Sequence, residues 1–224
     1  MTPMVLASAD LGGFYFFIRA LRESRWATLR LGLLSVTLFA TLRRGHDHAL
    51  GQVQPSALRV LALGRSLLHC AAPRDPRLHG QPTLCRPAPP RPDEPRLGPV
   101  SRWVVGLVGL AALGTGITMF LTPPLMIAIW PWSLTPLTCR VVGAIFCLGA
   151  AGIDTLADPR WIAIRLMLQV EAFMIALMLI AVLRAPGEFA TDRPLTWLML
   201  TGFTGVLLGS AYLWYSQEVA TRRT

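Results

Sequence analysis

The chain of 224 residues is 53% hydrophobic and only 15% charged, which is too apolar for an ordinary soluble domain, where about a quarter of residues are charged. All 21 basic residues are Arg, and the formal net charge is +9. Because Arg, Ala, Pro and Gly have GC-rich codons and Lys does not, this bias indicates a GC-rich genome rather than a nucleic-acid binder. The composition predicts an integral membrane protein that lies in the lipid bilayer, with its Arg residues concentrated in cytoplasmic loops.

Residues 1–42 contain apolar runs that are too short to cross a membrane. The run that ends at Ile18 is interrupted by Asp10, which leaves fewer than the roughly 20 apolar residues that a span needs. Leu31–Leu42 is also apolar but similarly short. We therefore expect one or two partial membrane segments in this N-terminal part.

Residues 43–99 differ from the rest of the chain in composition. They hold ten of the 18 prolines, all four His and nine of the Arg residues, and such a stretch is typical of a disordered basic loop. The segment contains four residues that could bind zinc, His69, Cys70, His79 and Cys85. Their spacing matches no standard zinc site. We predict no metal here.

The same segment poses a topological question. If Leu31–Leu42 crosses the membrane, one more crossing is needed before Arg102, because Arg residues mark both flanks as cytoplasmic. Two interpretations stay open. Either residues 43–92 are translated out of frame, with the frame restored near Asp93, or the basic loop is genuine and follows a half-inserted helix.

Four long apolar segments follow and predict a transmembrane helical bundle over residues 100–217, with a short tail at 218–224. The segments are Trp103–Leu121, Leu137–Ile153, Ile162–Leu183 and Leu195–Tyr215. At about 1.5 Å per residue each is about 25–33 Å long, which is enough for the hydrocarbon core. The predicted fold class is all-α, a polytopic transmembrane helix bundle with four full spans and one or two partial spans upstream.

Trp residues near the ends of these spans are expected to lie at the membrane–water interface, where the indole ring meets lipid and its N–H is solvated. The expected interface anchors are Trp103, Trp130, Trp132, Trp161, Trp197 and Trp214. Arg102, Arg160 and Arg222 all fall on one side of the bundle, which the Arg bias assigns to the cytoplasm together with the C-terminus. We expect a multi-pass protein of the bacterial cytoplasmic membrane.

The most distinctive stretch lies between the first two of these spans and reads WPWSLTPLTCR from Trp130 to Arg140. Its two prolines remove backbone donors and disfavour helix in the residues before them, which predicts a non-helical turn at the membrane surface. Ser133, Thr135 or Thr138 could cap the helix that follows. Arg140 then falls in the first turn of an apolar helix.

This stretch, followed by VVGAIFCLGAAG, resembles a motif in uncharacterised multi-pass membrane proteins of high-GC bacteria, whose members read WPW-x-LTPLT-x-R between two transmembrane helices. The resemblance extends over residues 94–215 and also covers Leu11–Leu42. It implies a membrane architecture with a further helix before residue 94, and it implies no particular activity.

Glu171 is the most informative polar residue because it lies near the middle of its predicted span. A carboxylate there is unfavourable unless it is neutral, paired or hydrated, so it should face the bundle interior. Arg165 is about 120° away around the helix, and it shares a face with Gln169. We expect Glu171 to pair with Arg140 of the preceding span or to share a water-filled pocket with it. The alternative is a neutral, hydrogen-bonded Glu171 that only locks helix packing.

Gly205 and Gly209 form a GxxxG pattern in the last span, a weak signal for helix contact within the chain or in a dimer. The sequence shows no nucleotide-binding loop, no ordered Ser/His/Asp set and no metal motif, so we predict no catalytic residue, cofactor or metal.

Two functions stay open. One is a non-enzymatic scaffold or accessory membrane subunit, with a membrane-protein partner or a homo-oligomer and no nucleic acid. The other is a small transporter or channel-like protein that uses Glu171 and Arg140.

Overall fold

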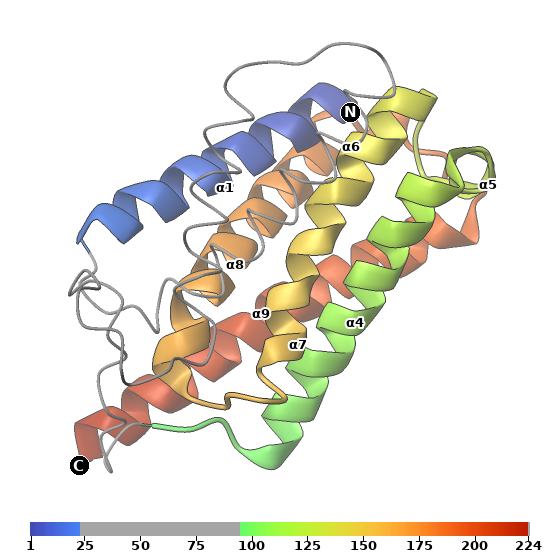
Figure 1. Cartoon of the computed structure of the whole chain (residues 1–224). Coiled ribbons are helices and arrows are strands. Elements are labelled where there is room, and N and C mark those ends of the chain that lie inside the picture. Colours follow the sequence, from blue (N-terminus) through green and yellow to red (C-terminus); the bar gives the residue numbers. More distant parts are fainter. Residues whose placement is uncertain (23–94, 224) are drawn as a thin grey trace, which may run out of the picture.

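The computed structural model describes residues 1–22 and 95–223, and in these residues the chain is an all-α bundle (Figure 1). The helices are α1 (Thr2–Arg22), α4 (Pro99–Leu121), α5 (Pro123–Ile129), α6 (Pro136–Phe146), α7 (Ala150–Asp154), α8 (Trp161–Arg184) and α9 (Pro194–Arg223). A 3-10 turn, η2 (Cys147–Gly149), joins α6 to α7, and a second, η3 (Pro186–Glu188), follows α8. In the described part of the chain five helices, with α6 to α7 counted as one, are long and apolar enough to cross a membrane. Their length and composition indicate a multi-pass membrane protein.

Helix α1 is longer than the sequence indicated, because it runs unbroken through Asp10. The buried residues of α1, such as Val5, Gly12 and Phe16, recur at helical spacing, and Asp10 is exposed. A polar residue on the outer side of a helix does not interrupt the packed side, so the acid is compatible with a helix of full spanning length. The expected partial span Leu31–Leu42 and the basic segment with its open reading-frame question lie outside the described residues.

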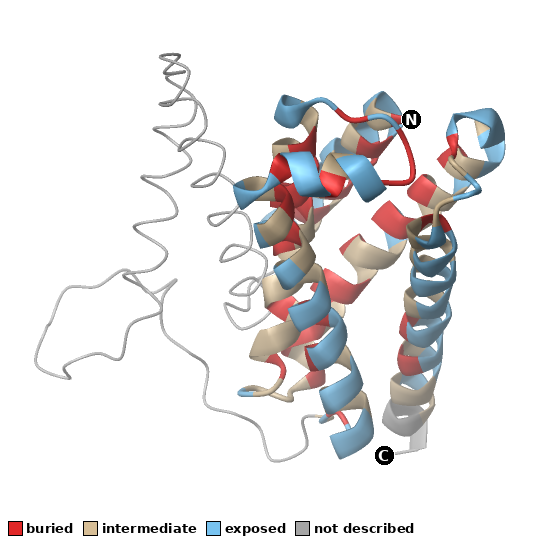
Figure 2. Cartoon of the chain, turned by 90° about the vertical axis from the view of Figure 1, so that its right-hand side faces the viewer, coloured by how far each residue is buried: buried red, intermediate tan, exposed pale blue. Residues whose placement is uncertain are grey.

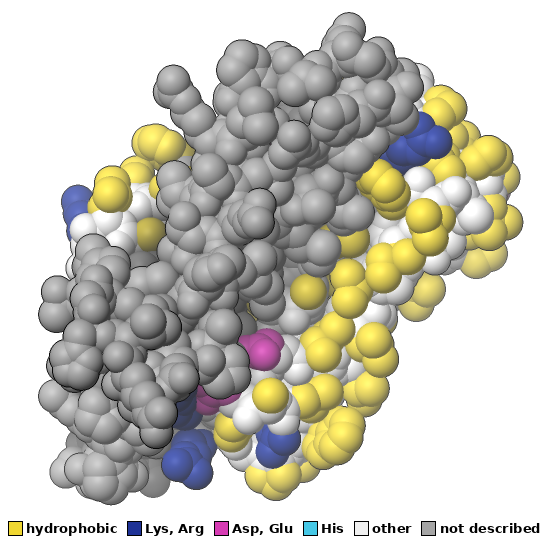
Figure 3. Space-filling model, in the orientation of Figure 1, with side chains coloured by type: hydrophobic (Ala, Val, Ile, Leu, Met, Phe, Trp, Pro, Cys, Tyr) yellow, Lys and Arg dark blue, Asp and Glu magenta, His cyan; other side chains and the backbone are white. Residues whose placement is uncertain are grey.

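Helix α4 packs closely against α6, η2 and α7 because glycines meet glycines along the contact. A Cβ added at Gly116 would lie 2.5 Å from the carbonyl oxygen of Gly143, and one added at Gly109 would lie 2.5 Å from that of Gly149. Such distances leave no room for a side chain, so the backbones of the two helices touch directly. On its other side α4 presents apolar side chains, which line the outer edge of the molecule in Figure 3.

Helix α8 lies between α1 and α9 and is the most deeply packed helix of the described residues. Gly12 of α1 packs against the side chains of Val170 and Met174. On the α9 side, the rings of Trp161 and Trp214 meet edge to face with their centroids 5.6 Å apart. These contacts make α8 the central element against which the candidate polar residues are placed.

One end of the bundle is closed by an aromatic cluster, which we call the Trp cap and define as Trp130, Pro131, Trp132 and Phe189. The ring centroids of Trp130 and Trp132 are 5.3 Å apart, and those of Trp132 and Phe189 are 5.7 Å apart. The backbone N–H of Ala190 donates to the Pro131 carbonyl at 2.8 Å. The indole N–H of Trp132 donates to the Thr2 hydroxyl at 3.1 Å. The Trp cap therefore joins the start of α1, the entry to α6 and the loop before α9.

The helix that follows the Trp cap begins as predicted. Thr135 is the N-cap of α6, and its hydroxyl accepts a hydrogen bond from the Thr138 backbone N–H. The Thr138 hydroxyl in turn accepts from the Thr135 backbone N–H at 2.9 Å. This reciprocal capping satisfies backbone donors that the helix start would leave unpaired, and it confirms Thr135 among the three predicted capping candidates.

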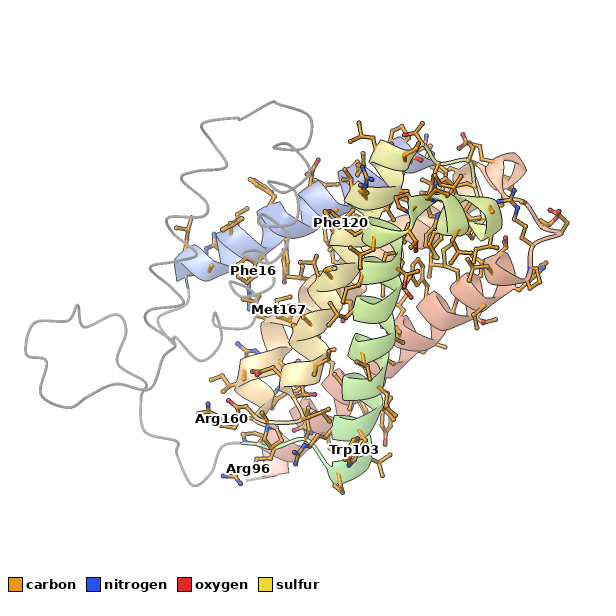
Figure 4. The ribbon with its side chains drawn as sticks, turned by 45° about the vertical axis from the view of Figure 1, so that its right-hand side comes forward. Phe16, Arg96, Trp103, Phe120, Arg160 and Met167 are labelled. Atoms are coloured by element: carbon orange, nitrogen blue, oxygen red, sulfur yellow. The ribbon has the colours of Figure 1, made fainter. Side chains whose placement is uncertain are left out.

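The opposite end of the bundle holds several Arg residues and is here named the arginine end, comprising Arg96, Arg102 and Arg160. The backbone N–H of Leu97 donates to Pro159 at 2.8 Å, and an antiparallel bridge joins Arg96 to Arg160. Arg160 also forms a 2.6 Å salt bridge with Asp158. Figure 4 shows Arg96 and Arg160 near each other, at the same end of the bundle as Trp103 of α4. The segment before α4 is thus fastened to the segment before α8.

Candidate functional site

The structure places the predicted Trp anchors in two different environments. Trp103 and Trp197 are exposed, 59% and 58%, as an interface anchor requires. Trp130 and Trp132 are only 2% and 5% exposed, so their rings contact protein and not lipid headgroups. Trp161 is buried and Trp214 is partly buried, and these two pack on each other. Cap and helix contacts enclose Trp130, Trp132 and Trp161, and the position of these residues at a membrane interface stays a prediction.

Glu171 lies on the most enclosed side of α8. Its neighbours one turn away on that side, Met167, Met174 and Ile175, are buried, and Glu171 itself is partly buried. By helical geometry it points about 100° away from Val170, the residue that meets α1. No hydrogen bond or ion pair joins Glu171 to the part of the chain that the structure describes. An acid in this position is unfavourable when charged.

Arg165 and Gln169 share one side of α8, as their spacing predicts, and it is not the side of Glu171. The Tyr15 hydroxyl of α1 donates a long hydrogen bond of 3.5 Å to the Gln169 side-chain oxygen. The ring of Tyr15 also lies 5.7 Å from that of Phe173. The Nε atom of Arg165 is buried and has no hydrogen-bond acceptor among the described residues. Gln169 thus helps to hold α1 on α8.

Arg140 stands in the first turn of α6, beside the buried Cys139, and is partly buried. Glu171 belongs to the middle of α8, many residues from either end of that helix. No ion pair joins Arg140 to Glu171 in residues 1–22 and 95–223. The predicted ion pair is absent from these residues, because a residue near the start of one span lies at a different depth from one in the middle of the next span. The alternative, a water-filled pocket shared by the two side chains, stays a prediction.

The glycines of α9 are placed quite differently from those of α4. Gly205 and Gly209 are exposed, and a Cβ added at either would meet nothing within 4 Å. Gly202 lies on the same face and is equally open. Helix α9 packs on the rest of the molecule with its other side, through residues such as Thr196 and Ser210. In Figure 2 the surface of this helix, which ends at the C label, is exposed where it faces away from the bundle.

Metal chemistry has no assembled ligand set in the described residues. No group of three or more His, Cys, Asp or Glu side chains lies close enough to hold a metal ion within 1–22 and 95–223. Cys139 and Cys147 are buried free thiols that face α4, where Cys147 lies beside Gly116 and the Cys139 thiol donates to the Met119 carbonyl oxygen. They are small packing residues at this contact.

Asp10 interrupts an apolar run in the sequence, but the structure places it within an unbroken helix of spanning length. The signal was present in the spacing. Its neighbours at helical distance on the outer side of α1, Phe14 and Phe17, are exposed as well.

No family model, no curated protein and no solved structure matches the chain. The fold and the placement of these residues therefore carry the functional conclusions.

Proposed function

We propose that this protein is a non-enzymatic membrane scaffold or accessory subunit that binds a further transmembrane helix on the outer face of α9. The observation that carries this proposal is the open glycine face, which consists of Gly202, Gly205 and Gly209. None of the three would bring an added Cβ within 4 Å of another atom, so their smallness serves no contact in the described bundle.

Helix association in lipid gains little from hydrophobic burial and depends on close backbone approach. Only 11% of the most apolar stretch of α9 is buried, against 44% for α8. Helix α9 is therefore held mainly by one side and by its attachment to the Trp cap. A second helix can approach the glycine face to short distance, as α6 approaches the glycines of α4.

The simplest occupant of this face is α9 of a second copy, since a two-fold axis would bring Gly205 of each copy together. A photoreactive side chain in place of Tyr212, which is exposed on the same side, tests this in native membranes. We expect an adduct of twice the chain mass that is lost in the Gly205→Leu/Gly209→Leu variant. Leu107 on α4 serves as the exposed control position. If the photoreactive group gives the same yield of adduct at Leu107 as at Tyr212, the proposal fails. It also fails if the adduct from Tyr212 survives in the double variant.

A second candidate function is proton-coupled transport at Glu171, favoured by an enclosed acid that has no ion-pair partner in the described residues. Intramembrane acids often mark proton pathways. Because Arg140 is not paired with it, this candidate rests on Glu171 alone. Its test is proton flux into vesicles that contain the protein and a pH-sensitive dye. Wild-type protein should exceed the protein-free rate and Glu171→Gln should not. Equal rates for both proteins would remove this candidate.

We also propose that the protein lies in a bacterial cytoplasmic membrane with the arginine end in the cytoplasm. Basic residues favour the cytoplasmic side. Among the described residues, eight Arg lie toward the arginine end, against three near the Trp cap (Arg140, Arg184 and Arg193); the eight are Arg19, Arg22, Arg96, Arg102, Arg160, Arg165, Arg222 and Arg223. The resemblance of the WPW stretch to membrane proteins of high-GC bacteria supports the same location. A fluorescent protein fused after Thr224 should fold and fluoresce, whereas a periplasmic alkaline phosphatase fusion should be inactive. The reverse pattern would contradict this orientation.

A further inference from the structure

The outer face of α1 combines exposed apolar side chains with one acid, which is unusual for a helix that crosses a membrane. Phe14, Phe17 and Leu21 are 64%, 49% and 88% exposed, which is the expected composition of a surface in lipid. Asp10 is exposed on the same side, four residues before Phe14, which places both on one face of the helix. We call these four residues the Asp10 face. It is an apolar and aromatic surface with one acid.

Asp10 lies deep within the span. It is about 12 Å from the start of α1 at Thr2 and about 18 Å from its end at Arg22, by helical rise. Gly12, two residues further, packs on Val170 and Met174 near the middle of α8. Two residues correspond to about 200° of rotation, so Asp10 points away from α8. The acid therefore stands at mid-depth on the side opposite the packed side.

A charged carboxylate facing hydrocarbon at that depth is unfavourable, and such residues are normally paired or turned to an interior. No hydrogen bond or ion pair within the described residues satisfies Asp10. Within residues 1–22 and 95–223 nothing compensates the acid, and a further membrane component can do so. The exposed apolar side chains before and after this position, Met4 on one side and Phe14 and Phe17 on the other, disfavour an aqueous surrounding and favour a packed helix.

We propose that the Asp10 face binds a transmembrane helix of another protein that carries an Arg or Lys at mid-membrane depth. Charge complementarity selects this occupant. A second copy of this chain, related by a two-fold axis, would bring Asp10 against Asp10, and two carboxylates at close range repel. A basic side chain from a partner helix supplies hydrogen-bond donors and an opposite charge at the one position that needs them.

This interaction does not rest on the glycine face of α9, which lies on a different helix and has no charged residue. The two surfaces fit different partners. The glycine face accepts any helix that approaches closely, whereas the Asp10 face discriminates by charge. The inference goes beyond a general scaffold role because it states the chemistry of the partner.

The test uses defined transmembrane peptides in lipid vesicles that contain the full chain. Each peptide has about 21 Leu and Ala residues, the length of one span, with a single central Arg, Leu or Glu. Energy transfer between labelled peptide and labelled protein reports association. Wild-type protein should bind the Arg peptide about tenfold or more tightly than the Leu peptide. Asp10→Asn should remove this difference, and Asp10→Arg should transfer the preference to the Glu peptide.

Controls separate binding from folding. Asp10→Asn should leave the thermal unfolding midpoint unchanged, since the side chain is exposed and makes no internal contact. Gly205→Leu/Gly209→Leu should keep the preference for the Arg peptide, because it alters only α9. Equal binding of the three peptides by the wild-type protein overturns the proposal. A second experiment places a photoreactive group at Phe14 in cell membranes. Cross-links only to the same chain or to a second copy would also overturn the proposal.

Discussion

Helices α4 and α9 carry the same sequence feature and use it in opposite ways. Both are long apolar spans with several glycines. In α4, Gly109 and Gly116 touch the backbone of the neighbouring helix. In α9, Gly205 and Gly209 face open space, and the helix is held through its other side.

The difference shows that small residues spaced along a span indicate the capacity for close approach and not the identity of the partner. Helix α4 meets α6, which supplies the complementary Gly143 from the next segment of the chain. Helix α9 is attached at its start instead, where the Arg193 side chain donates to the Trp130 carbonyl. One glycine face is thus satisfied internally, and the other is left for a partner.

The largest effect is expected from a side chain placed in the α4 contact. Gly116→Leu would force a side chain against the Gly143 carbonyl oxygen and the Cys147 sulfur. Overpacking costs about 1–3 kcal/mol where side chains can adjust, and backbone cannot adjust as readily, so we expect loss of folded protein. The measurement is the yield of monodisperse protein in detergent. Gly114→Leu, on the open side of the same helix, is the matched control and should be tolerated.

The next largest effect tests whether the Trp cap holds α9 in place. Trp132→Ala removes the ring that packs on Phe189 and the N–H that donates to Thr2. Truncation of a buried Trp costs about 3–5 kcal/mol, and the loss should appear as a lower midpoint in denaturing-detergent titration. Trp103→Ala, at an exposed ring, should shift the midpoint far less. If Trp132→Ala and Trp103→Ala shift the midpoint equally, the contacts of the Trp cap add no stability beyond that of a Trp ring exposed to detergent.

A smaller effect is expected at the start of α6, the helix that fills the glycine face of α4. Thr135→Ala removes one half of the reciprocal cap with Thr138. Loss of such a cap costs about 1 kcal/mol. The same titration should resolve it, with Thr201→Ala on the exposed side of α9 as the neutral control. A midpoint that does not move would show that water replaces the cap at this end.

The spans of the C-terminal part could be predicted closely because lipid requires long runs of uncharged residues. The expected Trp103–Leu121 and Ile162–Leu183 appear as α4 and α8 with bounds that differ by four residues or fewer. Helix α1 was underestimated because a hydropathy reading treats Asp10 as a break without knowing which side of the helix it occupies. Helix α9 continues through Arg223, so most of the predicted tail 218–224 is helical.

The candidate site was predictable only in part. The capping role of Thr135 could be predicted because its partner, Thr138, is only three residues away in the sequence. The burial of Trp130 and Trp132 depends on Phe189 and on α1, which are distant in the chain. The expected pairing of Glu171 with Arg140 required the relative depth of two helices, and spacing along one chain does not contain it. For the same reason, the sequence could not show which glycines meet a neighbour.

The most direct test of the contrast between the two helices compares two double variants in one denaturing-detergent titration, with photo-cross-linking from Tyr212 as the second readout. Gly205→Leu/Gly209→Leu should leave the unfolding midpoint at the wild-type value and abolish the adduct. Gly109→Leu/Gly116→Leu should abolish folding itself. If the α9 variant unfolds as readily as the α4 variant, its glycine face is part of the internal packing, and the account of α9 as the open helix is contradicted.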